Sequence, residues 1–201
     1  TVLAIYIALV LIVEGGSPHG QQFLANVKYF ATYTSNWFVD LDGGNRVIFY
    51  FAWSLATEEQ FYLVWPWIER FVKGTRPVWI MLGILALSEF ARLGLLDVAL
   101  PEGTLLHRIA ASVAPPICFG VLLAHMLDHP RGFAVAHRIL GRRYGSLMAF
   151  ALASFVVGTD LHAYSLLIGI AMTLIVAGCV VRGDHALAPI LTSRPFEHVG
   201  K

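Results

Sequence analysis

Two adjacent acids, Glu58 and Glu59, stand in the middle of an apolar stretch of the chain. An ionised side chain at the centre of a membrane helix costs about 2.5–3.5 kcal/mol on insertion scales, so each such residue needs a partner or a function. On a helix, Ser54, Glu58 and Tyr62 are spaced four residues apart and share one face, with Glu59 about 100° further round. A carboxylate beside a hydroxyl and a phenol can accept or donate a proton. The alternative role is structural, in which the two acids cap a broken helix or pair with a buried arginine.

Two further groups of charges lie in or beside apolar runs. Glu89 and Arg92 are three residues apart, and this spacing predicts an ion pair that neutralises both side chains. Arg108 follows His107 at the start of another apolar run. Its side chain can extend to the outer lipid headgroups, or it can point inward and bind a phosphate, sulfonate or carboxylate.

The composition points to the environment in which these charges are placed. Of 201 residues, 57% are apolar and only 13% are charged, with a mean hydropathy of +0.68. A soluble domain carries about 25% charged residues. We therefore exclude a disordered protein, a coiled coil and most water-soluble enzymes, and the net charge of +1 argues against a nucleic-acid partner. The sequence predicts an integral membrane protein.

Neither a disulfide framework nor a metal site is expected. Cys118 and Cys179 are the two cysteines, and each lies in an apolar run without a paired or metal-ligand spacing. The eight histidines form no His-x-x-x-His pair.

Six apolar stretches approach the length of about 20 residues that spans a bilayer. They cover residues 1–13, 47–72, 78–96, 109–127, 144–158 and 163–181, of which the first is incomplete and the fifth is short. None alternates with a period of two, so we predict an all-α fold, a polytopic transmembrane helix bundle with about six spans. Pro115 and Pro116 should break or kink the fourth span. Residues 15–46 are expected to form a long surface loop, with room for a short interfacial helix.

The basic residues give this bundle an orientation. Ten of the fourteen lysines and arginines fall in loop 69–77, loop 128–144 and the tail from residue 182, while the alternate loops are poor in basic residues. By the positive-inside bias, the basic loops are cytoplasmic and residues 1–13 run from inside to outside.

The stretch from Trp53 to Pro66 (WSLATEEQFYLVWP) resembles the signature of the acyltransferase 3 family of membrane acyltransferases. That signature runs Trp-Ser-Leu, two variable residues, Glu-Glu-Gln-Phe-Tyr-Leu, one variable residue and Trp-Pro. Thr104 and Arg108, followed by the run 119–124 (FGVLLA), are similar to a second and looser family pattern, and the run 198–201 (HVGK) to a third. Asn36 matches an asparagine found in the preceding loop of relatives. The resemblance covers residues 50–201.

The resemblance implies a bundle of about ten membrane helices in the full family domain. It also implies transfer of an acyl group, commonly acetyl, from acyl-CoA to a hydroxyl of a carbohydrate or glycolipid at the bacterial inner membrane. Glu58 and Glu59 are then supporting catalytic residues, and Trp53, Ser54, Tyr62 and Arg108 are candidates for substrate binding. Arg108 and the basic inner loops can engage phosphates of the acceptor or of CoA.

The family's principal catalytic histidine lies in its first helix and has no match here. We therefore expect residues 1–201 to be a partial acyltransferase domain, truncated at both ends and inactive alone. Two other functions remain open: a transporter or flippase of a glycan or lipid that uses the same charges as a permeation path, and a non-catalytic membrane scaffold.

Overall fold

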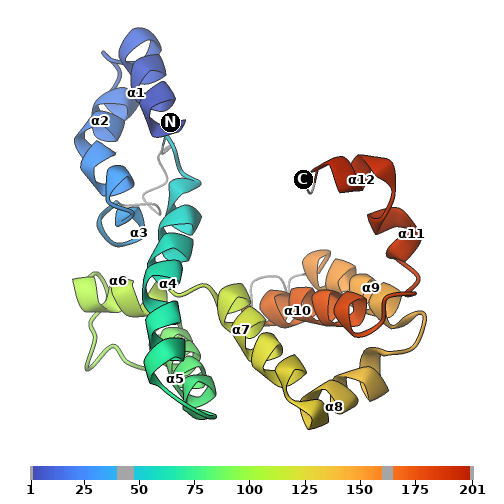
Figure 1. The fold of residues 1–201 in the computed structure, drawn as a ribbon. Helices are drawn as coiled ribbons and strands as arrows, with labels where there is room; N and C mark the ends of the chain where they lie inside the picture. Colours follow the sequence, from blue (N-terminus) through green and yellow to red (C-terminus); the bar gives the residue numbers. More distant parts are fainter. Residues whose placement is uncertain (1, 40–47, 160–164, 200–201) are drawn as a thin grey trace. The chain divides into compact units, whose positions relative to one another are not determined.

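The computed structural model describes residues 2–39, 48–159 and 165–199, and every regular element in these ranges is helical (Figure 1). This confirms the predicted all-α class. The helices form two compact units, unit 1 (Thr1–Ala114) and unit 2 (Pro115–Lys201). The helices of unit 1 are α1 (Val2–Val13), α2 (Pro18–Ala31), α3 (Ser35–Phe38), α4 (Ala52–Phe71), α5 (Arg76–Arg92) and α6 (Leu105–Ala111). Those of unit 2 are α7 (Pro115–Asp128), α8 (Pro130–Leu140), α9 (Gly145–Val157), α10 (Ser165–Val181), α11 (Ala188–Leu191) and α12 (Arg194–Val199).

Most of the expected long loop at residues 15–46 is helical instead. Helix α2 begins after Ser17, whose hydroxyl accepts a hydrogen bond from the Gly20 N–H at 3.0 Å, and Pro18 occupies its first turn. Phe23 and Phe30 are seven residues apart, so they share one face, and both are buried. A search for long apolar runs misses such a helix, because polar residues separate the apolar residues that share its buried face.

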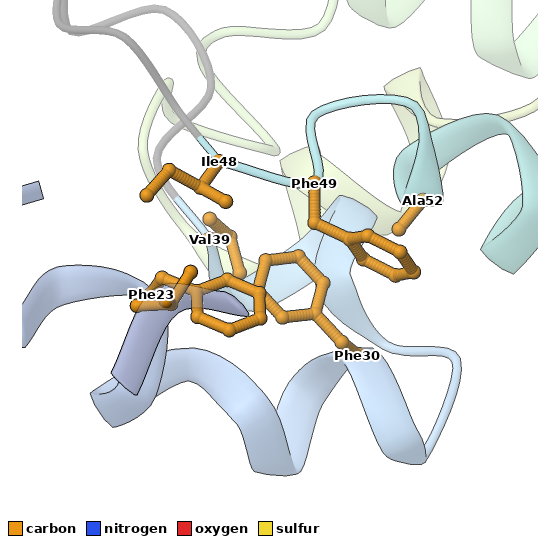
Figure 2. Close-up of a cluster of buried hydrophobic side chains, with 7 residues drawn as sticks. Phe23, Phe30, Val39, Ile48, Phe49 and Ala52 are labelled. Atoms are coloured by element: carbon orange, nitrogen blue, oxygen red, sulfur yellow. The ribbon is translucent and has the colours of Figure 1, made fainter. Parts of the chain in front are cut away.

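An aromatic cluster anchors the chain just before α4. The Phe49 ring meets that of Phe30 edge to face, with centroids 5.4 Å apart (Figure 2). It meets the Tyr6 ring in the same way at 4.8 Å. Phe23 stacks on Phe30 at 5.6 Å. Phe49 has a positive φ of 67°, which is strained for a bulky side chain, so its packing holds the backbone there. The cluster thereby fixes where α4 starts relative to α2.

The other predicted spans agree with helices to different degrees. Residues 47–72 contain α4, 78–96 overlap α5, 144–158 contain α9, and 163–181 contain α10. The fourth span is divided into α6 and α7, and Pro115 is the first residue of α7, as the proline pair predicted. Loop 128–144 was expected to be irregular but contains α8, which follows His129 and starts at Pro130.

Among the described residues, no single helix combines the length and the apolarity needed to cross a membrane, although α6 and α7 meet that requirement together, with a break between them.

In unit 2, α9 and α10 pack against each other through small residues. Ser146, Ala149 and Ala153 of α9 are buried, as are Ala177 and Gly178 of α10. Many large apolar side chains of the same two helices are exposed, namely Leu147, Met148, Phe150, Leu152, Phe155, Val157, Leu167, Ile170, Met172, Val176 and Val180. Small residues at the contact allow two helix backbones to approach closely.

The two helices lie close together at Gly178, where we predict that an added methyl group is destabilising. A Cβ at this position would lie 3.0 Å from Ser146 Cα and 3.2 Å from Ser146 N, and both are backbone atoms that cannot rotate away. Gly178→Ala should therefore lower the free energy of unfolding by about 1–2 kcal/mol, measured by denaturant titration in detergent.

The matched control is Gly120→Ala in α7, where an added Cβ would meet nothing within 4 Å. This change should stabilise the protein by about 0.5–1 kcal/mol through helix propensity. If Gly178→Ala were as stabilising as Gly120→Ala, the close helix contact would be wrong.

Candidate functional site

Helix α4 carries Trp53, Ser54, Glu58, Glu59 and Tyr62 on one continuous stretch of helix. Ser54, Glu58 and Tyr62 therefore lie on one side of α4, as their spacing of four residues predicts. The Ser54 hydroxyl donates to the Phe51 carbonyl at 3.0 Å, and the Tyr62 side chain is exposed. Within the described part of the chain no hydrogen bond links Ser54, Glu58 and Tyr62 to one another, and they are related by their shared helix face.

Glu58 and Glu59 are both exposed. Within the described part of the chain neither carboxylate forms an ion pair or a hydrogen bond, so neither pairs there with an arginine. They also lie well inside α4 and do not cap an end of it. Both carboxylates are thus accessible on the surface of unit 1, as a group that meets a substrate must be.

On the side of α4 away from Glu58, a pair of amide side chains holds the helix against α3. Asn36 of α3 donates through Nδ2 to Gln60 Oε1 at 3.0 Å, and Gln60 donates through Nε2 to Asn36 Oδ1 at the same distance. Gln60 also donates to the Tyr33 carbonyl at 2.6 Å. Near the start of α4, the buried Ser35 hydroxyl donates to the Ala52 carbonyl at 3.2 Å. These bonds fix the rotation of α4 about its axis, and hence the direction in which Glu58 points.

The buried Thr57 extends this network to the end of α6. Its hydroxyl lies 3.1 Å from the Trp53 carbonyl, 3.4 Å from the Ser112 carbonyl and 3.4 Å from Asn36 Nδ2. The Trp37 indole N–H donates to Ser112 Oγ at 3.0 Å. Helices α3, α4 and α6 therefore meet at one polar junction, formed by Asn36, Trp37, Thr57, Gln60 and Ser112.

Arg108 lies on α6 beside this polar junction. Its Nη1 donates to the Trp37 carbonyl at 3.3 Å, and its side chain is exposed. The guanidinium has five N–H donors and uses one of them here, so the others can bind an anionic group. Arg108 is thus held by α3 and remains open to a ligand.

The predicted ion pair between Glu89 and Arg92 is confirmed. Arg92 Nη1 lies 2.9 Å from Glu89 Oε1, while Arg92 Nε donates to the Ala111 carbonyl at 2.9 Å and Nη2 donates to the Val113 carbonyl. Arg92 therefore caps the carbonyl end of α6, and His107 Nε2 lies 3.2 Å from the Ala91 carbonyl. This pair positions the helix that carries Arg108.

The sequence argument singled out Asn36 only by resemblance and missed Thr57, Gln60 and Ser112. A usable signal was present, because Thr57 and Gln60 are uncharged polar residues three apart in an apolar helix. Such a pair must find hydrogen-bond partners when one side of the helix is buried. Their partners depend on the fold of residues 15–39, which the sequence predicts to be part of a loop.

Comparison with known proteins adds no relative. No family model, no curated protein and no solved structure matches the chain. The function is therefore inferred from the residues and geometry of the chain itself.

Proposed function

We propose that this chain belongs to an integral membrane O-acyltransferase of the acyltransferase 3 family, a polytopic bundle in the bacterial inner membrane. The reaction moves an acyl group, acetyl in the simplest case, from acyl-CoA to a hydroxyl of a carbohydrate or glycolipid. One observation carries the proposal: Glu58 and Glu59 are exposed on α4, which the signature residue Gln60 and the neighbouring Thr57 hold against α3 and α6, and Arg108 of α6 lies beside that junction.

The membrane setting is supported by the packing of α9 and α10. Their contact buries small residues, and many of their large apolar side chains are exposed. A soluble protein rarely exposes so many large apolar side chains on two helices, whereas membrane helices associate through small residues and present large apolar ones to lipid. The alternation of basic and basic-poor segments along the sequence supports the same setting.

The chemistry assigns different roles to the two charge types. In acyl transfer the acceptor oxygen attacks the thioester carbonyl carbon, a C–O bond forms, the C–S bond breaks and CoA leaves as a thiol. A base must take the hydroxyl proton as the bond forms. Glu58 can accept that proton or orient a histidine that accepts it, with Glu59 in a supporting role. Arg108 can hold an anionic part of the acceptor or donor. Ser54 and Tyr62 share the helix face of Glu58 and are candidates for substrate contact, as is Trp53 one residue before Ser54.

Removing the gene from its host tests this function. We expect O-acyl groups to disappear from one envelope glycan, as measured by mass spectrometry of the purified glycan, and to return when the gene is restored. Loss of the glycan from the outer surface, with its acylation intact inside the cell, would instead indicate a transporter or flippase. Unchanged acylation together with unchanged glycan distribution would contradict both functions.

A further inference from the structure

Unit 2 contains an apolar groove that the proposed reaction does not use. It has a volume of about 310 Å³ and lies between α7, α8 and α10. The lining residues are Phe119, Leu122, Leu123, Met126, Val135, Ala136, Ile139, Leu140, Thr173, Leu174 and Ala177. The volume is at the lower end of the range of about 300–1,000 Å³ typical of ligand sites.

The groove offers almost nothing to a polar ligand. Thr173 has the only hydroxyl among the lining residues, and it already donates to the Gly169 carbonyl at 2.7 Å. The floor contains no amide, carboxylate or cation. The groove therefore suits a hydrocarbon chain and would not recognise the adenine or the pantetheine amides of CoA.

Helix α8 combines this apolar wall with a basic face. Ala136 is buried against its neighbours, while Val135 and Ile139 line the groove and remain 55% and 66% exposed. Arg131 and Arg138 are four residues before and three residues after Val135, so they lie beside it on the helix surface. Both arginines are exposed. An arginine therefore lies on each side of Val135 along α8, beside the groove.

The residues on and directly after α8 carry charge of one sign, and Asp128, exposed at the end of α7, is the acid that precedes them. From residue 129 to 145 the sequence contains Arg131, Arg138, Arg142 and Arg143 and no acid. Asp184, an acid from the segment that follows α10, is already paired with Arg182, with Nε and Oδ1 2.7 Å apart. Arg182 Nη1 also donates to the Gly141 carbonyl at 2.8 Å, which ties the end of α8 to the end of α10. Arg131 and Arg138 are exposed, and within the described part of the chain no ion pair joins either of them to Asp128 or Asp184.

We infer that this groove binds an anionic phospholipid of the bilayer, with one acyl tail between α7, α8 and α10 and the headgroup phosphate at Arg131 and Arg138. Amphipathic helices with basic polar faces bind at the headgroup boundary, and basic clusters between membrane helices recognise anionic headgroups. The assignment requires the membrane setting and is independent of the acyl transfer reaction.

The test measures bound lipid and does not involve acylation, so its outcome is separate from that of the proposed function. The full-length protein, purified in detergent, is mixed with phosphatidylglycerol or phosphatidylcholine, and retained lipid is counted by native mass spectrometry. We expect phosphatidylglycerol to be retained over phosphatidylcholine, and Arg131→Gln with Arg138→Gln to lower its affinity about tenfold or more. The pair Arg131→Lys and Arg138→Lys should keep most of the affinity, because both charges remain.

Two further variants separate a seated lipid from general attraction to the surface. Lys73→Gln with Arg76→Gln removes two exposed charges from a basic segment of unit 1, and it should leave binding unchanged. Val135→Trp fills the groove at a half-exposed position without altering charge, and it should lower binding about as much as the arginine changes.

Several results would overturn the assignment. Equal retention of both lipids, or an equal loss in the Lys73 and Arg76 variant, would show that the groove is not selective. Unchanged binding in Val135→Trp would show that no tail occupies the groove. Displacement of phosphatidylglycerol by palmitoyl-CoA at equal concentration would assign the groove to the acyl donor instead.

Discussion

Glu58→Gln is expected to lower O-acylation of the envelope glycan about 100-fold while the protein remains at its normal level in the membrane. Glutamine keeps the shape of the side chain but cannot accept a proton or stabilise a charged imidazole, and proton transfer by a positioned group contributes about 10²–10⁴-fold. Because Glu58 is exposed and forms no ion pair within the described part of the chain, its loss should not unfold α4. The measurement is glycan O-acyl content in cells that express each variant from the native gene.

The matched control is Glu69→Gln, which removes another exposed carboxylate from the same helix. This variant should acylate at the wild-type rate, because Glu69 lies near the other end of α4. Wild-type turnover by Glu58→Gln at normal protein abundance would remove Glu58 from the mechanism. A fall in membrane abundance that matches the fall in acylation would give Glu58 a role in folding instead.

The elements predicted from the sequence are those governed by local rules. The length of the apolar run is sufficient to predict α4, and helical spacing then places Ser54, Glu58 and Tyr62 on one face. The spacing of Glu89 and Arg92 is sufficient to predict their ion pair, because both residues lie on one helix. Pro115 likewise breaks a helix through its own ring and its missing N–H. None of these predictions requires knowledge of a distant partner.

The features missed by sequence reasoning depend on residues far apart in the chain or on a less obvious periodicity. The amide pair of Asn36 and Gln60 joins residues 24 positions apart, and it forms only because the aromatic cluster at Phe49 holds α2 near the start of α4. Helices α2 and α8 have polar residues on one face, so neither appears as an apolar run. The sequence therefore predicts the candidate residues on α4 and α6, and the structure shows the junction that positions them.

Arg92→Met is expected to lower the free energy of unfolding by about 2–3 kcal/mol. The Arg92 and Glu89 side chains are only 27% and 14% exposed, so the substitution leaves a largely buried carboxylate without its nearest cation. Breaking a fully buried pair costs about 3–5 kcal/mol, and the residual exposure lowers that figure. The Ala111 and Val113 carbonyls also lose their guanidinium donor, which loosens the end of α6. Denaturant titration in detergent, followed by circular dichroism, measures the change.

A double-mutant cycle separates the ion pair from the helix cap. Glu89→Gln with Arg92→Met should cost less than the sum of the two single changes, because the ion pair is then lost only once. The remaining loss includes the bonds from Arg92 to the Ala111 and Val113 carbonyls. Arg92→Lys should fall between wild type and Arg92→Met, since an ammonium keeps the charge but lacks the planar fork that reaches several acceptors. If the single changes were additive, Arg92 would act on α6 alone, and the ion pair with Glu89 would contribute nothing to stability.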